Sequence, residues 1–318
     1  MKRALLVGID TYDHWPDLTA CVKDVEALAP LLTHHEDGAD NFAVTSITSR
    51  DKRIDRSCLM RHVREALSSN TDVLVLYFAG HGAARAGDVI LCTQEGDVHD
   101  EGVAFSALLG LIHASTIDEV IVILDCCFSG GAGGNPVIGG DMSYVRPGVA
   151  ILSASRHDEL AEETQKGQGR FSFFLCAALE GGAADVLGHV GVIGAYAYLR
   201  ESFGVGEQSP TFKCNVAKLH KLRRCTPAVP LAEIQRLPEF FKTGPAFEHP
   251  LDPSYEPTAK PRHHQHEAIF AILQRYRAAK LVEPIGVPHM YDAAIQSLPC
   301  RLTPLGRHYR HLVAQGLL

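Results

Sequence analysis

The sequence lacks the features that mark membrane and secreted proteins. None of its apolar stretches approaches the roughly 20 residues that a membrane-spanning helix needs. The residues Met1 to Arg3 lead into a short apolar run that contains Asp10, so the pattern of a cleaved secretion signal is missing as well. We therefore expect a cytoplasmic protein that has no membrane partner.

An excess of basic residues and a metal-binding cysteine pattern are also missing. The chain has 30 Lys and Arg against 37 Asp and Glu, a formal net charge of −7. This balance gives no general attraction to nucleic acid or to anionic lipid. The nine cysteines are odd in number and include no C-x-x-C pair, and Cys126 and Cys127 are adjacent, so we expect reduced thiols and no zinc site.

What the sequence does contain is a regular alternation of apolar runs and amphipathic segments. Short apolar runs predict strands at residues 4–10, 43–48, 72–78, 89–93, 119–124 and 149–155. Helical spacing of apolar residues predicts helices at 23–32, 55–67, 105–113, 171–179 and 194–202. Strands that alternate with helices indicate an α/β fold with a mostly parallel sheet, and we assign it to a domain spanning residues 1–224.

The remainder of the chain has a different composition. Prolines recur from Pro227 to Pro261, which predicts an extended connector over residues 225–262, although aromatic residues such as Phe241 are available to pack against a domain. Residues 263–318 predict three short helices, the last with Thr303 as N-cap and Pro304 at its first position. We interpret this part as a small helical or winged-helix-like module.

Two of the predicted strands end in residues that carry chemistry. Residues 73–82 read VLVLYFAGHG and residues 121–130 read IVILDCCFSG, so His81 and Cys127 both lie near the carboxyl end of a strand. A cysteine nucleophile needs a base and N–H donors for the oxyanion; His81 supplies the first, and the backbone amides of Gly82 and Cys127 the second. Taken singly, a turn histidine or a core cysteine explains either residue, and only the combination favours catalysis.

The two motifs together resemble the cysteine peptidases of the caspase and metacaspase group. His81 and Cys127 are 46 positions apart in the sequence, close to the roughly 50 expected for this order. The D-x-C-x-S-G form is similar to metacaspases and their bacterial relatives, with Phe128 where histidine is common. The resemblance covers residues 1–222, including LLVGID, LTACVKDVEAL and QSPTF. It implies the caspase-like three-layer α/β fold, with Cys127 as nucleophile and Cys126 as its neighbour.

The resemblance also implies a substrate pocket. In the metacaspase pattern the S1 pocket is lined by residues that match Cys21, Asp24 and Asp125, while Ala79 stands where the family has serine. Two carboxylates at one cavity favour a guanidinium or an ammonium group, so we expect cleavage after Arg and then Lys. For Asp24, the alternative is that its carboxylate only caps a helix.

Calcium is the one cofactor that the resemblance leaves open. Many metacaspases bind it through aspartates after the histidine strand, and Asp97, Asp100 and Glu101 follow that strand here. Their spacing departs from the family pattern, so an acidic surface loop is the other interpretation. We predict no other metal or cofactor.

The sequence therefore predicts a cytoplasmic cysteine endopeptidase that acts on proteins with Arg or Lys at the cleavage site. By analogy with bacterial relatives, it would be a regulated protease in defence or cell death, with the carboxyl-terminal module recruiting a sensor or an inhibitor protein. Two alternatives remain open. One is a non-catalytic caspase-like scaffold; the other is a regulator whose carboxyl-terminal module binds DNA, although we do not expect a nucleic-acid partner.

Overall fold

The computed structural model describes residues 1–68, 70–85, 88–129, 145–154, 167–204, 210–215, 220–242, 244 and 247–318, with residues 127–129 as backbone only. It divides the chain into two compact units. Unit 1 comprises residues 1–184 and 189–225, and unit 2 comprises residues 185–188 and 226–318. No helix in these ranges is long and apolar enough to cross a membrane.

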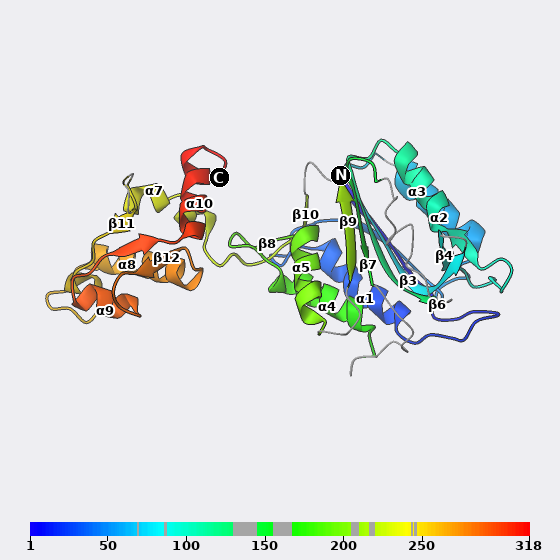
Figure 1. The fold of residues 1–318 in the computed structure, drawn as a ribbon, viewed down its shortest axis with the longest axis horizontal. Helices are drawn as coiled ribbons and strands as arrows, with labels where there is room; N and C mark the ends of the chain where they lie inside the picture. The colour runs from blue at the N-terminus through cyan, green and yellow to red at the C-terminus, as the bar shows by residue number, and fades with distance from the viewer. Residues whose placement is uncertain are drawn as a thin grey trace. The chain divides into compact units, whose positions relative to one another are not determined.

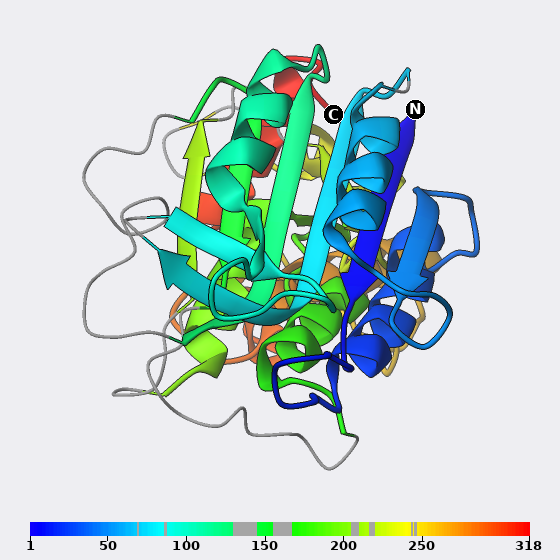
Figure 2. The same cartoon turned by 90° about the vertical axis from the view of Figure 1, so that its right-hand side faces the viewer.

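An eight-stranded sheet forms the centre of unit 1 (Figures 1 and 2). Its main path has the order β2-β1-β3-β6-β7-β9, in which every neighbouring pair is parallel except β7 and β9. These strands are β1 (Lys2–Gly8), β2 (Ala43–Thr48), β3 (Val73–Arg85), β6 (Glu119–Ser129), β7 (Val149–Ser153) and β9 (Thr211–Asn215). The strands β4 (Asp88–Cys92) and β5 (Gly102–Ala104) continue antiparallel from the end of β3.

Helices cover both faces of this sheet, because its central strands are apolar on both sides. Side chains of one parity, such as Leu76 and Phe78, pack with α2 (Arg56–Ser68) and α3 (Phe105–Ala114). Side chains of the other parity pack with α1 (Cys21–Thr33), α4 (Arg170–Ala177) and α5 (Val192–Ser202). Figure 1 shows the sheet between these two groups of helices. The prediction of a three-layer α/β fold with a mostly parallel sheet is confirmed.

Smaller elements complete unit 1. A π-helix, η1 (Ala178–Gly182), follows α4, and β8 (His189–Gly191) pairs antiparallel with β10 (Lys221–Arg224). Asp55 caps α2, since its Oδ1 accepts the N–H of Cys58 at 2.7 Å.

The two strands that carry the chemical motifs extend beyond their predicted ends. The predicted strands stop at residues 78 and 124, but β3 continues to Arg85 and β6 to Ser129. The reason is mutual support, because the two strands stay paired up to Ala83 and Ser129, and β4 pairs with β3 from Gly82 to Arg85. Strand pairing therefore carries the motif residues past the point where the apolar runs stop.

Unit 2 contains short helices and a three-stranded antiparallel sheet of order β11-β13-β12. Its elements are α6 (Leu231–Ile234), α7 (Leu237–Phe240), β11 (Glu248–His249), η2 (Pro253–Tyr255), α8 (His264–Ala278), β12 (Val282–Pro284), α9 (Met290–Ile295), β13 (Cys300–Leu302) and α10 (Pro304–Ala314). The predicted cap is present, since Thr303 Oγ1 accepts the N–H of Gly306 at 3.1 Å. The winged-helix class itself stays a prediction.

The proline-rich residues differ from the extended connector that their composition predicts. Val229, Leu237 and Phe241 are buried in the same core as Leu273 and Tyr276 of α8. Prolines occupy the first turns of α7 and η2, where a missing N–H costs no helical hydrogen bond. The prolines therefore begin short helices, and the apolar residues between them supply core.

Candidate active site

The strand register brings His81 and Cys127 together. β3 and β6 are parallel neighbours, paired from Val73 and Glu119 to Ala83 and Ser129, and the Cα partner of His81 is Cys127. Parallel neighbours lie about 4.8 Å apart in the hydrogen-bonding direction. The structure thus places the predicted base and nucleophile at matching positions at the carboxyl end of the sheet.

Alternation along β6 distinguishes the two adjacent cysteines. Cys126 is 1% exposed and packs with Leu124 in the core on the α2–α3 side of the sheet. Ile123 belongs to the core on the opposite side, so positions 125 and 127 share the parity of that face. Cys126 is therefore a core thiol, and position 127 has the parity of Asp125.

The loop after β1 holds His81 from the side. The N–H of His81 donates to the hydroxyl of Tyr12 at 2.8 Å, and the two rings lie 4.8 Å apart. Nε2 of His81 lies 2.7 Å from the carbonyl oxygen of Pro16, a contact in which only the nitrogen can donate. This contact favours the tautomer that carries the proton on Nε2 and leaves Nδ1 as the basic nitrogen.

Tyr12 keeps its proton in this position. Burial raises the pKa of Tyr12 well above its ordinary value. The neutral phenol therefore accepts the backbone N–H of His81 and packs against its ring without adding a charge beside it. The half-buried Trp15 ring lies 6.4 Å from the histidine ring on the same loop.

The two acids of the expected S1 pocket converge on the amino terminus of α4. Asp24 is 2% exposed and Asp125 is 4% exposed. Asp24 Oδ1 accepts the N–H of Gly169 at 2.9 Å, and Asp125 Oδ2 accepts the hydroxyl of Ser172 at 2.6 Å. A Cβ built on Gly169 would lie 3.0 Å from Asp24 Oδ2 and 3.4 Å from Asp125 Oδ2. Gly169 thus marks the place where the two carboxylates meet.

Tyr77 continues this network into the core. Its hydroxyl lies 2.6 Å from the Ser172 hydroxyl, which in turn donates to Asp125. Burial, with the charges of Asp125 and Asp24, raises the pKa of Tyr77 well above its ordinary value. Three elements, α1, β3 and α4, therefore contribute to the surroundings of the Asp125 carboxylate.

The other predicted site residues lie around Asp24 and Asp125. Ala79 is fully buried on β3, and its Cα partner on β6 is Asp125. Cys21 begins α1, is buried, and its N–H donates to Asp10 Oδ1 at 2.8 Å. Gly82 pairs with Phe128 of β6 and with Leu91 of β4, one position beyond His81. The residues named from the motifs are thus brought to one end of the sheet.

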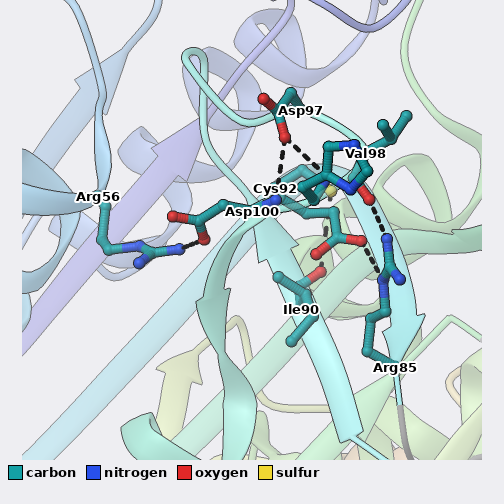
Figure 3. Close-up of polar contacts among 9 residues, drawn as sticks. Arg56, Arg85, Ile90, Cys92, Asp97, Val98 and Asp100 are labelled. Atoms are coloured by element: carbon teal, nitrogen blue, oxygen red, sulfur yellow. Dashed lines mark hydrogen bonds and ion pairs between the residues drawn. The ribbon is translucent and has the colours of Figure 1, made fainter.

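The acids expected to hold calcium are engaged by arginines of α2 and β3 and by backbone N–H groups of their own loop (Figure 3). Arg56 pairs with Asp100, and Arg85 with Glu101. Asp97 Oδ1 accepts the N–H groups of His99 and Asp100 at 2.7 and 3.0 Å, and these bonds lower the pKa of Asp97. Across the ranges that the structure describes, no three His, Cys, Asp or Glu side chains are grouped to hold a metal ion.

Several residues of the site were not predicted. Tyr12 and the Pro16 carbonyl lie in the loop after β1, and Gly169 and Ser172 lie at the start of α4. The sequence signal was weak, since it showed only an aromatic loop and a small-residue helix start. Their roles depend on contacts between segments far apart in the chain, such as Tyr12 with His81 and Ser172 with Asp125.

Comparison with known proteins assigns the family. No curated protein matches the chain. Two solved structures are similar in fold: a structural-genomics protein of Geobacter sulfurreducens (19% identity, 71% of this chain and 97% of that chain, TM-score 0.49) and caspase-1 of Spodoptera frugiperda (11% identity, 70% and 90%, TM-score 0.48). The peptidase C14 family profile, described as a caspase domain, matches residues 1–220. The chain therefore belongs to the caspase family of cysteine peptidases.

Proposed function

We propose that the protein is a cysteine endopeptidase that cleaves after basic residues through a Cys127–His81 dyad. The observation that carries the proposal is the register of β3 and β6, in which His81 and Cys127 are direct Cα partners. A base that neighbours a cysteine at a strand end is the arrangement that thiolate formation requires. Membership of the caspase family supports the same reaction class.

The reaction follows from the groups around the dyad. Nδ1 of His81 takes the Cys127 thiol proton while Nε2–H stays on the Pro16 carbonyl. The thiolate attacks the substrate carbonyl carbon, and the N–H groups of Gly82 and Cys127 donate to the oxyanion. The tetrahedral intermediate expels the amine, which takes the proton from His81, and a thioester remains on Cys127. Water, deprotonated by His81, then hydrolyses the thioester and restores the thiol.

Asp125 and Asp24 are the proposed specificity residues, with Cys21 and Ala79 in the wall of the pocket. Both carboxylates are buried and approach the same point at Gly169, so their negative charges act at one place in a region of low dielectric. The planar guanidinium of arginine can donate to two carboxylates at once, whereas the lysine ammonium acts as a point charge. We therefore expect Arg to be preferred to Lys, and both to be preferred to Asp.

A regulatory role for unit 2 completes the proposal. Fused to a peptidase, a separate compact unit is suited to recruit a protein sensor, inhibitor or substrate, and bacterial defence or cell death is the setting that the family resemblance suggests. If unit 2 instead binds DNA, its affinity for a duplex should fall steeply with salt. A gel-shift series at rising salt concentration separates these two partners.

Hydrolysis of fluorogenic peptides with Arg, Lys or Asp before the scissile bond tests the proposal. We expect Cys127→Ala and His81→Ala each to lower kcat/KM on the Arg peptide by more than about 1,000-fold. Cys126→Ala is the matched control, since that thiol is buried in the core and should not take part in the chemistry. Activity of Cys127→Ala equal to that of the parent protein would overturn the assignment.

The scaffold alternative makes a different prediction for a covalent probe. An arginyl chloromethyl ketone should alkylate Cys127 in the folded parent protein, and mass spectrometry should locate the adduct on that residue. A folded protein that is not labelled and hydrolyses none of the peptides would support the non-catalytic scaffold.

A further inference from the structure

A pocket of about 390 Å³ lies at the opposite end of the sheet from His81. It surrounds the first residue of β6, Glu119, with lining residues from the segment after α3, the segment before β7, and His220 before β10. Cys127 lies eight residues further along the same strand, roughly 26 Å away at about 3.3 Å per residue. The pocket is therefore separate from the proposed catalytic site.

The Glu119 carboxylate is satisfied on one oxygen only. Its side chain is 2% exposed. Oε2 accepts both the backbone N–H and the ring Nδ1–H of His220, at 2.9 and 2.6 Å. Oε1 is buried and has no hydrogen-bond partner among the residues that the structure describes. A carboxylate oxygen accepts hydrogen bonds and a buried one nearly always receives at least one, so Glu119, a lining residue of the pocket, has an acceptor that lacks a donor.

The cation that lines the pocket is already bound by the chain itself. The Arg146 guanidinium donates to the carbonyl oxygens of Ile112, Ile117 and Pro147, at 3.1, 2.9 and 2.7 Å, and to Ser115 Oγ at 3.2 Å. These bonds direct its N–H groups to the protein and not to an anionic ligand. The exposed Asp118 adds a second carboxylate to the lining. The acceptors that remain for a ligand are therefore mainly negative.

A second cation close to Glu119, Lys2 of β1, is also engaged elsewhere. Lys2 is close enough to Glu119 for that charge to act on its pKa, but burial is the larger effect and lowers it. The Lys2 ammonium donates to Asn41 Oδ1 at 2.9 Å and to the Lys221 carbonyl at 2.7 Å. Lys2 therefore does not supply the donor that Glu119 Oε1 lacks.

We propose that this pocket binds a cation with N–H donors, an alkylammonium or a guanidinium, through Glu119 Oε1 and Asp118. The volume lies within the range of about 300–1,000 Å³ that small-molecule sites occupy, and is far more than the roughly 30 Å³ of one water. The group is carried either by a free amine or by a Lys or Arg side chain of another protein. Glu119 lies at the start of the strand that ends in Cys127, which makes the pocket a position for a regulator remote from the substrate.

Thermal unfolding with agmatine, which has both cationic groups, tests the proposal. Trp15 is the only tryptophan of the chain, so its fluorescence reports the unfolding of unit 1. A ligand that binds only the native state raises the melting temperature in a saturable way. We expect a saturable rise with agmatine, no rise with 1,4-butanediol or with KCl of equal ionic strength, and loss of the rise in Glu119→Gln.

Matched variants separate binding at Glu119 from binding elsewhere on the protein. Glu26→Gln removes an exposed carboxylate of α1 and should keep the agmatine effect. Asp118→Asn, at an exposed position, should raise the half-saturating concentration about threefold or more, and it provides the test if Glu119→Gln does not fold. A rise that survives Glu119→Gln but disappears in Asp125→Asn would place agmatine in the S1 pocket and overturn the proposal. No saturable rise in the parent protein would overturn it too.

A peptide distinguishes the two sources of the cation. An Arg-containing tripeptide with blocked ends presents the same guanidinium as a protein side chain. If its Glu119-dependent rise saturates at a lower concentration than that of agmatine, the natural ligand is a protein; the reverse order indicates a free amine. Both outcomes support the cation site, and each assigns one source.

Discussion

Unit 1 holds two groups of acidic side chains that look alike in the sequence and differ in the structure. Asp24 and Asp125 are buried and approach each other at Gly169, held by a backbone N–H and a serine hydroxyl. The acids at residues 97–101 lie in a loop, where arginines pair with two of them. The first group brings its charges together, whereas in the second Asp100 and the buried Glu101 are each paired with a separate arginine (Figure 3).

This difference determines which of the two groups can bind a cation selectively. A buried carboxylate loses hydration and interacts strongly with a cation that replaces the lost water, whereas an exposed ion pair contributes only about 0–1 kcal/mol. The proposed S1 pair therefore has the physical basis for choosing a basic side chain. The loop acids, through Arg56 of α2 and Arg85 of β3, instead hold the loop after β4 in place.

Of the changes that test this comparison, removal of the Asp125 charge should have the largest effect. Asp125→Asn keeps the shape and an acceptor for Ser172, but it removes one partner of the substrate guanidinium. Loss of a buried charge partner costs about 2–4 kcal/mol, so kcat/KM for the Arg peptide should fall about 30- to 1,000-fold. Asp100→Asn in the loop is the control and should change it less than about twofold. Equal losses in both variants would break the comparison.

A smaller effect is expected where the two carboxylates meet. Gly169 has φ −62°, which alanine adopts freely, so Gly169→Ala acts through its Cβ, only 3.0 Å from Asp24 Oδ2. Such overpacking costs about 1–3 kcal/mol, and part of it should appear as a KM for Arg peptides raised about 3- to 10-fold.

The control for this variant is Gly110→Ala in α3, where a Cβ would meet nothing within 4 Å. It should leave KM unchanged and add slightly to stability, since alanine favours the helix by about 1 kcal/mol over glycine. A normal KM in Gly169→Ala, with the folded structure intact, would mean that the substrate side chain does not reach this point.

The sequence predicts which strand ends lie together at the candidate site, and it indicates little of the contacts around them. The strands that carry His81 and Asp125 are long apolar runs, and residues at the ends of neighbouring parallel strands necessarily lie side by side. Tyr12 and Ser172 contact the site through segments far apart in the chain, and spacing along a sequence carries no record of such contacts. The acidic residues show the same limit, because composition does not distinguish two acids that converge on one point from acids that are each paired with an arginine.

In unit 2, composition predicts less packing than the structure has. Its prolines predict an extended segment, yet Val229, Leu237 and Phe241 are fully buried. Proline fixes φ and removes one N–H, which is compatible with helix starts and turns as well as with an extended chain. The apolar residues between the prolines were the better signal for a packed unit, because an extended connector exposed to water would not bury them.

The smallest expected effect comes from breaking a loop ion pair. Arg56 and Asp100 are 45% and 70% exposed, so Arg56→Ala should change the free energy of unfolding by less than about 0.5 kcal/mol, measured by urea denaturation followed through Trp15.

Calcium should have no effect on stability, because the loop acids already accept from arginines and backbone N–H groups. It should not raise the melting temperature over an EGTA control, either in the parent protein or in Arg56→Ala. A rise of several degrees that Asp97→Asn abolishes would show that these acids reorganise around the ion. Both groups of acids would then bring their carboxylates to one cation. The difference between them would be that the loop acids do so only when calcium is bound.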